Sequence, residues 1–307
     1  MLNWDDLRFF LEVARTQRIS TAGVRLGVEH TTVARRIRQL ESSLNTVLFE
    51  KSRALGFTLT PAGNDLLRHV EKMESLLLNA TEEVGSLGDS LSGHVKIAAT
   101  EGFGSFVLTT IAMQFQEQYP GITLDVMPFQ RVVSLSKRET DIVISIERPA
   151  RGPYVGGKLG DYVLKLYATH EYLEKAPPLQ MPDDLSQHRF IAYIDELVIS
   201  NQLRYVEDMI PTEKIVFRSN SVVAQMRACL QGTALAILPC FMAQGQPRLV
   251  SVLDTEMTLT RSFWMYYHED LKNLKRIELF TRYIKQVMEQ NKAFMMGKSP
   301  QLKVSVP

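Results

Sequence analysis

Hydrophobic positions near the N-terminus recur at steps of three and four residues, which is the period of an amphipathic helix. The first such helix runs to about Arg15 and carries its apolar side chains at Trp4, Leu7, Phe10, Leu11 and Ala14. A second helix follows, with apolar contacts supplied by Ala22, Val24 and Leu26. Ser20 can cap the start of this helix, and Gly27 can adopt the left-handed conformation that ends it in a tight turn.

A third helix is predicted over residues 31–44, and its apolar and polar side chains separate onto opposite faces. The apolar face is formed by Val33, Ile37, Leu40 and Leu44, and the polar face by Thr31, Thr32, Arg35, Arg38 and Gln39. Two helices joined by a glycine turn, the second presenting arginine and hydroxyl groups, are typical of a helix-turn-helix that reads the major groove of DNA. Arginine can donate two hydrogen bonds to guanine, or it can bind phosphate. The alternative is a solvated face on an ordinary helical bundle.

Two short runs of strand-forming residues come next, at 47–50 and 57–60, around a polar turn that contains Lys51, Arg53 and Gly56. The pattern predicts a β-hairpin. Beside a helix-turn-helix a hairpin forms a wing, in which Lys51 and Arg53 would contact phosphate or the minor groove. Residues 15–53 hold eight basic and three acidic residues, a net charge of +5 in a chain whose total is +1. The hairpin and this basic excess favour a DNA-binding head over a plain bundle.

A long helix is predicted over residues 61–91, because Thr60 offers a cap and Pro61 suits the first helical position. Its apolar residues alternate steps of four and three at Leu66, Val70, Met73, Leu77, Ala80, Val84, Leu87 and Leu91. Such a seam is typical of a coiled coil, and pairing two helices of roughly 45 Å would hold two heads at the spacing of two half-sites. The alternative is a helix that lies on the core of its own domain. Gly85, Gly88 and Gly93 predict a hinge after it.

Behind the hinge, strand and helix patterns alternate, which indicates an α/β domain with a parallel sheet. Strands are expected at 94–100, 122–129, 141–146, 214–218, 235–238 and 262–267. Helices are expected after the first strand, at 221–230 and near the C-terminus, the last one carrying Leu274, Ile277, Ile284 and Val287.

Ligands of such sheets bind beyond the carboxyl ends of strands, where helix N-termini present free N–H groups. Thr100, Glu101 and Gly102 occupy one such position, and Asn220 and Ser221 occupy another. We expect them to face each other across a cleft that holds a small effector. The alternative is that they are helix caps without a ligand.

Composition and motifs limit the remaining classes of function. A chain of 307 residues, 45% of them hydrophobic, is long enough to form several domains. It has neither an apolar run of membrane-spanning length nor the basic start of a secretory signal, so we expect the protein to be located in the cytoplasm. The sequence holds no G-x-S-x-G, GxGxxG, P-loop or HExxH motif, and its six histidines are dispersed, so no enzyme, metal site or cofactor is expected. A periplasmic solute receptor would need a signal peptide. Cys229 and Cys240 lack metal-site spacing; we expect them to be structural, with a reversible redox pair as the alternative.

Several short motifs, in order, resemble those of the LysR-type bacterial transcriptional regulators. In the head they are FFLEVA (9–14), STA (20–22), LGV (26–28), LE (40–41), LFEK (48–51) and LTPAG (59–63). Behind it they are YPGI (119–122), DIVI (141–144) and GTALAILP (232–239). The resemblance covers nearly the whole chain, except the residues after about 293.

The resemblance implies a multi-domain protein: a winged helix-turn-helix head (1–60), a dimerising linker helix (61–91), an α/β periplasmic-binding-protein-like effector domain (92–300) and a tail (294–307). The effector domain would have two subdomains, I at 92–162 and 268–293 and II at 163–267, joined by crossover strands near 162–169 and 262–267. It also implies homodimers that pair into homotetramers, effector-dependent bending of an operator, control of a neighbouring operon and RNA polymerase as a candidate partner.

The family's DNA contacts correspond to His30, Thr31, Thr32, Ala34, Arg35, Arg38, Lys51 and Arg53. Its effector contacts correspond to Thr100, Glu101, Gly102, Phe129, Ser145, Asn220 and Ser221. Departures from the family pattern are Ala34 for serine, Asn45 for glycine, Lys51 for arginine, Ala234 for glycine and the unusual Glu101. A carboxylate at 101 would repel an anionic effector, so we expect an effector with a donor or positive group.

Overall fold

The computed structural model describes residues 3–52, 56–85, 91–129, 140–148, 152–198, 200–204 and 209–304. The chain divides into two compact units. The N-terminal unit holds the described residues up to 85, and the C-terminal unit holds those from 91 on. The long helix after the wing therefore belongs to the N-terminal unit.

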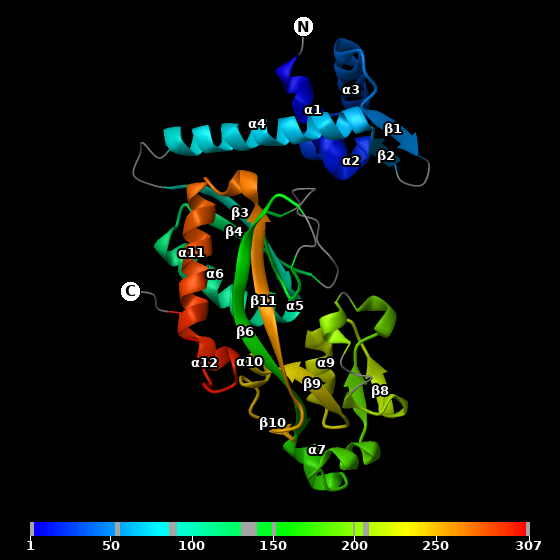
Figure 1. Ribbon diagram of the computed structural model, residues 1–307, viewed down its shortest axis with the longest axis vertical. Helices are drawn as coiled ribbons and strands as arrows, with labels where there is room; N and C mark the ends of the chain where they lie inside the picture. The colour runs from blue at the N-terminus through cyan, green and yellow to red at the C-terminus, as the bar shows by residue number, and fades with distance from the viewer. Residues whose placement is uncertain are drawn as a thin grey trace. The chain divides into compact units, whose positions relative to one another are not determined.

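The N-terminal unit contains the predicted three helices, hairpin and long helix (Figure 1). They are α1 (Trp4–Thr16), α2 (Ile19–Leu26), α3 (His30–Leu44), β1 (Phe49–Ser52), β2 (Gly56–Leu59) and α4 (Pro61–Gly85). Phe10, Val13, Val33 and Leu40 are fully buried at the centre of the helices. Gly27 ends α2 at φ 67° and Asn45 ends α3 at φ 48°, both in the left-handed region, as predicted for these two residues.

Four details of the predicted helices are wrong. The helix α2 begins at Ile19 after Arg18, so Ser20 lies within its first turn and is not its N-cap. Trp4, Val24 and Leu44 were assigned to apolar faces but are exposed, Val24 by 83%. Trp4 is the first residue of α1 and Leu44 the last of α3, so both stand at helix ends, where periodicity does not show how far the core extends. Val24 lies two residues after the buried Ala22, about 200° around α2 and therefore on its opposite face.

The wing is fixed to the helices by hydrogen bonds. The Glu41 carboxylate accepts from the backbone N–H of Leu48 at 2.8 Å and of Phe49 at 3.2 Å. The Thr60 hydroxyl accepts from Gly63 N at 3.0 Å, which confirms its capping role, and donates to Val47 O at 2.8 Å. The hairpin strands pair in antiparallel fashion from Phe49 opposite Leu59 to Ser52 opposite Gly56. The wing is thus held rigidly next to α3.

The predicted seam of α4 is divided between two environments. Val70 is buried in the core of the N-terminal unit, and Leu66 and Met73 pack against that core. Leu77 is 68% exposed and Ala80 is also exposed. The first half of the seam therefore follows the alternative, a helix lying on its own domain, and only the second half is available to a partner. Of the remaining seam residues, the side chain of Val84 and all of Leu87 lie outside the described part of the chain. The prediction is wrong for Leu91, which is not helical and packs against the core of the C-terminal unit.

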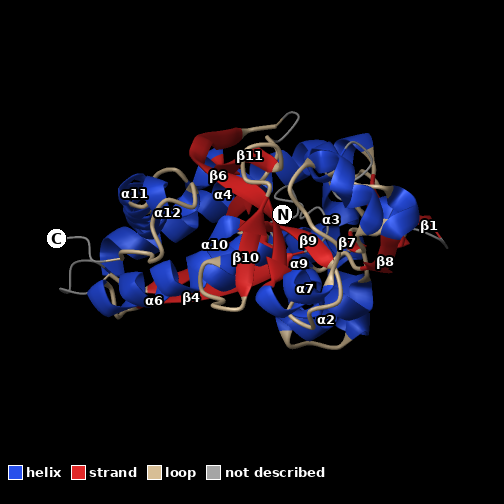
Figure 2. Cartoon of the chain, turned by 90° about the horizontal axis from the view of Figure 1, so that it is seen from below, coloured by secondary structure: helices blue, strands red, loops and turns tan. Residues whose placement is uncertain are grey.

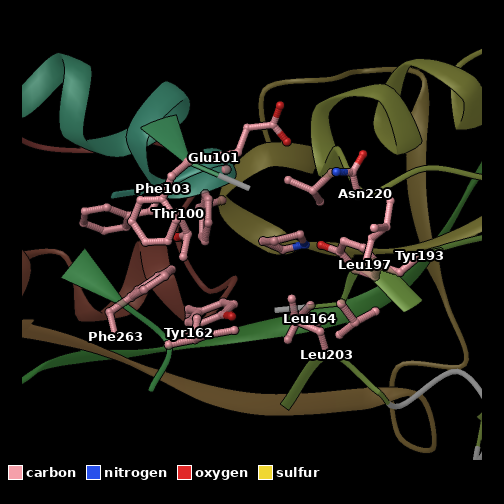
Figure 3. A pocket seen from close by; sticks show the side chains of 17 residues that line it. Thr100, Glu101, Phe103, Tyr162, Leu164, Tyr193, Leu197, Leu203, Asn220 and Phe263 are labelled. Carbon is pink, nitrogen blue, oxygen red and sulfur yellow. The ribbon is translucent and has the colours of Figure 1, made fainter. Parts of the chain in front are cut away.

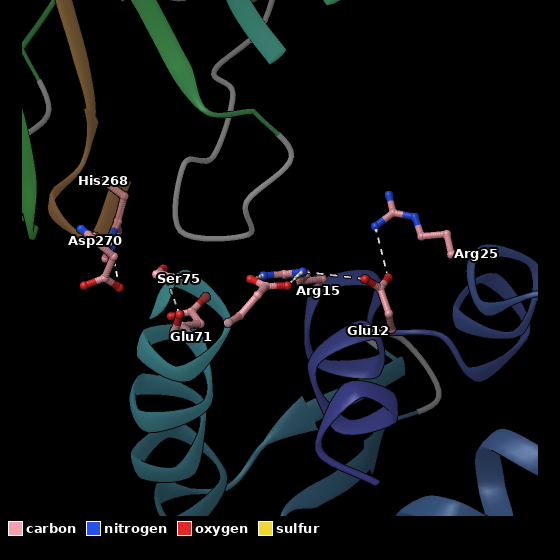
Figure 4. Close-up of polar contacts among 8 residues, drawn as sticks. Glu12, Arg15, Arg25, Glu71, Ser75, His268 and Asp270 are labelled. Carbon is pink, nitrogen blue, oxygen red and sulfur yellow. Dashed lines mark hydrogen bonds and ion pairs between the residues drawn. The ribbon is translucent and has the colours of Figure 1, made fainter. Parts of the chain in front are cut away.

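Ion pairs fasten α4 and α2 to α1 (Figure 4). The Arg15 guanidinium donates two hydrogen bonds, of 3.0 and 2.6 Å, to the carboxylate of Glu74. Glu12 lies 3.6 Å from Arg15 and from Arg25. The position of the long helix relative to the first helix is thus set by a charge pair as well as by packing.

The C-terminal unit is built on one mixed sheet of nine strands in the order β4-β3-β5-β11-β6-β9-β7-β8, with β10 also pairing with β6. The strands are β3 (Gly93–Thr100), β4 (Ile122–Phe129), β5 (Ile142–Ser145), β6 (Tyr154–Thr169), β7 (Phe190–Ala192), β8 (Ile215–Arg218), β9 (Leu235–Pro239), β10 (Leu249–Val252) and β11 (Thr258–His268). The pairs within β3, β4 and β5 are parallel, as predicted. The pairs of β8 and β9 are parallel too, but each is with β7, a strand that was not predicted, as β10 was not.

The two parallel groups form the cores of two subdomains, and the long antiparallel strands β6 and β11 cross between them. Both predicted crossovers are confirmed, each longer than expected. Figures 1 and 2 place α11 (Lys275–Gln290) and α12 (Lys292–Met295) toward one side of these strands, and α7 (His170–Lys175) and α9 (Val222–Cys229) toward the other. The helix α5 (Glu101–Phe103), a π-helical turn (Gly104–Leu108) and α6 (Thr109–Gln118) link β3 to β4, and α10 (Cys240–Ala243) follows β9.

The residues that follow the last long helix are part of the packed structure. Phe294 and Met295 are buried, and Leu302 and Val304 pack against the same core. Asn291, at the end of α11, donates to Val287 O at 2.7 Å and accepts from Lys303 N at 2.7 Å. This clamp folds the described part of the C-terminal segment back onto α11.

Candidate functional site

The outer face of α3 carries the residues that the sequence assigned to DNA. His30, Thr31, Arg35 and Arg38 are exposed, and Thr32 and Ala34 are half-buried. Their neighbours Val33, Ile37 and Leu40 are buried beneath them. The Arg35 guanidinium lies 3.5 Å from Gln39 Oε1, and Arg38 Nε donates to Ala34 O at 3.2 Å. Among the ion pairs of the described residues none involves Arg35 or Arg38, so both guanidinium groups have donors left for an anionic partner.

Arg36 stands between these two arginines but points into the head. Its guanidinium donates to Asp6 Oδ1 at 2.9 Å and lies 3.6 Å from Asp5 Oδ2. It also lies 5.4 Å from the centre of the Phe9 ring. The Asp6 side chain is only 6% exposed. The helical period therefore divides three nearby arginines into two that face solvent and one that holds α3 against α1.

The wing contributes Lys51, which is exposed and whose ammonium lies 5.6 Å from the centre of the Phe57 ring. Arg53 lies outside the described residues. Gly56, the first residue of β2, has to be glycine. Its φ is 77°, and a Cβ atom there would come within 2.4 Å of Gln17 O. Phe57 N donates to the same carbonyl at 2.8 Å. The second strand of the wing is thus anchored to the end of α1.

A cavity lies between the two subdomains of the C-terminal unit, at the carboxyl ends of β3 and β4 and the start of α9 (Figure 3). It contains about 600 Å³ of empty space, including the solvent at its mouth. Of the seven predicted effector contacts, five line it: Thr100, Glu101, Gly102, Phe129 and Asn220. Ser145 and Ser221 are not among the lining residues.

Most of the lining was missed by the sequence reasoning, because it is apolar. It comprises Phe103, Ile146, Tyr162, Leu164, Tyr193, Leu197, Val198, Leu203, Val222, Pro239, Phe241 and Phe263. Tyr162 and Phe263 come from the crossover strands and stack at 4.3 Å with an interplanar angle of 14°. Phe103 contacts the same stack, with its ring centre 4.5 Å from that of Phe263. Alternation along the crossover strand could not have identified them, because Tyr162, Val163 and Leu164 are all buried in β6.

The hydroxyl groups of the cavity are uncharged. Burial raises the pKa of both Tyr162 and Tyr193 far above its ordinary value, and the carboxylate of Glu101 raises the pKa of Tyr193 further. Both phenols therefore stay protonated at neutral pH. Among the lining residues that the structure describes, Glu101 is the one with a charged side chain.

Two serine–carboxylate hydrogen bonds connect the subdomains near the cavity. The Ser221 hydroxyl, which caps α9 by accepting from Ala224 N, donates to Glu101 Oε1 at 2.8 Å. The buried Ser200 hydroxyl donates to Glu147 Oε1. Both carboxylates belong to the first subdomain and both serines to the second. We call these two contacts the serine clasps; they hold the described subdomains together over the cavity.

The two cysteines lie elsewhere and are fully buried. Burial raises the pKa of Cys229 to about 12 and that of Cys240 to about 11. Cys240 Sγ lies 3.0 Å from Met295 O, next to the C-terminal clamp. Because a protonated thiol is a poor nucleophile, this environment favours the structural role over a redox pair. The described residues contain no cluster of three or more His, Cys, Asp or Glu that could hold a metal, and no described helix is long and apolar enough to span a bilayer.

Two family models match the chain. Residues 4–64 match the bacterial regulatory helix-turn-helix protein, lysR family, and residues 88–289 match the LysR substrate binding domain. The transcriptional regulator PtxR of Pseudomonas aeruginosa is 24% identical over 82% of this chain and 82% of its own. The transcriptional activator TtdR of Escherichia coli is 27% identical over 60% of this chain, and the match covers 59% of TtdR.

Solved structures share the fold. The full-length virulence activator AphB of Vibrio cholerae, a member of the LTTR family, has a TM-score of 0.56 at 21% identity and covers 92% of this chain and 98% of its own. Full-length LysG of Corynebacterium glutamicum, with bound effector Arg, has a TM-score of 0.64 at 16% identity and covers 94% and 99%.

Proposed function

The chain belongs to the LysR family of bacterial transcriptional regulators, and from this membership we propose which of its residues bind the operator, the effector and a second copy. It is a DNA-binding regulator with an effector-binding domain, and its relatives are regulators rather than enzymes. In our assignment residues 1–60 form the DNA-binding head, 61–91 the dimerising linker and 92–300 the effector domain. The expected tail, 294–307, is not separate in its described part, which packs against the effector domain.

The operator contacts are assigned to the outer face of α3 and to the wing. They are His30, Thr31, Thr32, Ala34, Arg35, Arg38, Lys51 and Arg53. The observation that carries this assignment is the division of the arginines: Arg35 and Arg38 face solvent without an ion-pair partner among the described residues, while Arg36 is tied to Asp6. A face with spare guanidinium donors above a rigid apolar core suits both phosphate contacts and base-edge contacts.

The effector site is assigned to the cavity between the subdomains. Thr100, Glu101, Gly102, Phe129 and Asn220 would contact the ligand directly, while Ser221 would act through Glu101. Ser145 would support the site from its edge; its hydroxyl accepts from Glu147 N at 3.2 Å, next to one serine clasp. The LysG structure, which carries an amino acid as effector, supports a small molecule as the ligand of this fold.

The dimer contact is assigned to the seam of α4, from Leu66, Val70 and Met73 through Leu77 and Ala80 to Val84 and Leu87. Exposure of Leu77 and Ala80 supports a partner helix on the second half. We further propose that dimers pair into tetramers, that the protein acts in the cytoplasm and that RNA polymerase is a partner at activated promoters.

Genomic footprinting of the purified full-length protein tests the proposal. The expected result is protection of paired half-sites in front of a small number of genes, with the protected length or DNA bend changing when the effector is added. Binding should weaken steeply as salt is raised, because phosphate contacts release counterions. Failure to retain chromosomal fragments at low ionic strength, or sedimentation as a monomer, would contradict it.

A further inference from the structure

A second pocket lies on the crossover strands of the C-terminal unit, and its described lining residues all differ from those of the effector cavity. It contains about 890 Å³ of empty space, including the solvent at its mouth. We call it the tryptophan pocket; its lining includes Arg148, Tyr154, Gly156, Lys158, Trp264 and Tyr266. Successive residues of a strand point to opposite faces, so Trp264 lines this pocket while Phe263 lines the effector cavity.

The register of β6 against β11 explains how these side chains meet. Lys158 lies opposite Trp264, and Gly156 lies opposite Tyr266. Residues that stand opposite each other in an antiparallel pair share one face of the sheet. A Cβ atom at position 156 would come within 2.1 Å of Met265 O, so this position has to be glycine. The backbone of β6 is therefore left uncovered among the aromatic side chains.

Arg148 is held against the indole ring of Trp264. Its guanidinium carbon lies 3.8 Å from the ring centre, which is contact distance for a flat group on a ring face. The Arg148 side chain is exposed, and no hydrogen bond or ion pair joins its guanidinium to any described residue. A guanidinium stacked in this way keeps its N–H donors in its own plane. The indole thus positions a fork of free donors at the pocket.

The acidic groups of this region already have partners. Asp161 Oδ1 lies 2.7 Å from the Lys158 ammonium, and the Glu147 carboxylate accepts from Ser200 in a serine clasp. The Glu147 charge also acts on Tyr266, where burial chiefly and this charge to a smaller extent raise the pKa of the phenol, so Tyr266 stays protonated at neutral pH. Both carboxylates are engaged, whereas the stacked guanidinium still has donors to offer.

We propose that the tryptophan pocket is a second ligand site, which binds a small aromatic oxyanion: a flat ring that carries a carboxylate or a phosphate. The oxyanion accepts two parallel hydrogen bonds from the Arg148 guanidinium, a pairing whose geometry the planar fork matches. The ring lies over the uncovered backbone at Gly156, against the side chains of Tyr154 and Tyr266, whose ring centres are 6.2 Å apart. This site does not depend on the residues assigned to the effector cavity.

The fluorescence of Trp264 tests the proposal directly. The chain contains two tryptophans, and the other, Trp4, is 70% exposed, so Trp4→Phe leaves the fold intact and Trp264 as the one indole. This full-length variant is titrated with phenylacetate, phenyl phosphate, the neutral phenylacetamide and the saturated cyclohexylacetate. At least one aromatic oxyanion should change the emission saturably and bind about tenfold more tightly than the amide and the saturated acid. The tighter of the two identifies the oxyanion.

Two substitutions of Arg148 in the same background locate the binding. Arg148→Gln should reduce the affinity for the oxyanion to that for the amide. Arg148→Lys, which keeps the charge but loses the fork, should also weaken binding. Arg282→Gln is the matched control, because it also removes one positive charge, from a side chain that is 55% exposed on α11 and is not in the lining; it should leave the affinity unchanged.

Three outcomes would overturn the proposal. Neither oxyanion changes the emission of Trp264, the response survives Arg148→Gln, or Arg282→Gln weakens binding as much as Arg148→Gln does. The last outcome would show that the overall charge of the protein, and not the positioned guanidinium, attracts the ligand.

Discussion

Replacing the three arginines of α3 by alanine one at a time should separate folding from DNA binding. Arg36→Ala removes the partner of Asp6, whose side chain is 6% exposed, and the cation over Phe9. Breaking a buried ion pair from one side costs about 3–5 kcal/mol. Because the Arg36 side chain is 25% exposed and water can replace part of its contact, we expect the N-terminal unit to lose about 2 kcal/mol.

Arg35→Ala and Arg38→Ala should have the opposite profile. Both side chains are exposed, so the free energy of unfolding should change by less than about 0.5 kcal/mol. If the arginine contacts a base edge, the free energy of operator binding should weaken by about 1–3 kcal/mol. If it contacts phosphate, the number of counterions released on binding, measured from the salt dependence of the affinity, should fall by about one. Arg68→Ala is the charge-matched control, since Arg68 is exposed on α4 and pairs only with Asp65 among the described ion pairs.

Urea unfolding, monitored by circular dichroism, measures the change in stability. Fluorescence anisotropy with the footprinted operator measures the change in DNA affinity. The reasoning is refuted if Arg36→Ala weakens operator binding in a protein of unchanged stability, or if Arg35→Ala and Arg38→Ala destabilise the head. A double-mutant cycle of Arg36 with Asp6 adds a second check, because the two changes should not be additive if the pair accounts for the loss.

Three further outcomes are expected. Ellman's reagent at pH 8 should react with both thiols only after denaturation, because burial raises the pKa of Cys229 to about 12 and that of Cys240 to about 11. In the unfolded chain each thiol has the ordinary pKa of 9.0. The free energy of unfolding should therefore fall as the pH rises above 9.0. Gly102→Ala would place a Cβ atom 2.9 Å from Met242 Sδ, so thermal unfolding should show a loss of about 1–3 kcal/mol in the C-terminal unit. Leu77→Glu should leave the unfolding of the head unchanged but shift sedimentation toward the monomer, since this side chain is 68% exposed.

The head could be predicted almost completely from the sequence, because its signals are local. Gly27, Asn45, Thr60 and Pro61 end or begin elements through their own backbone preferences, and the structure contains each of these boundaries. The seam of α4 could be predicted only as a periodicity. The same spacing describes Val70, which is buried in its own core, and Leu77, which is exposed. A period gives the face of a helix and not the identity of what covers that face.

The cavity was predictable at its polar rim and not in its interior. Thr100, Glu101 and Asn220 stand at strand ends and helix starts, which a sequence pattern reveals. Tyr162 and Phe263 stand in the middle of strands, 101 positions apart, and are brought together by the pairing of β6 with β11. Their role depends on register across that pair, which no local signal specifies.

Glu101 connects the two properties of the cavity, its charge and its closure. Its carboxylate accepts from Ser221 of the opposite subdomain, and Glu101 is the one ionisable acidic or basic side chain among the described lining residues. A hydrogen bond to a charged group is worth about 1.5–3 kcal/mol, which is similar to the coupling free energies that join effector binding to a change of state. An effector that contacts this carboxylate, as proposed above, would compete with Ser221 for it and would change the strength of one serine clasp, whereas Ser200 and Glu147 are not among the lining residues. Effector binding and subdomain closure would then be coupled through a single side chain.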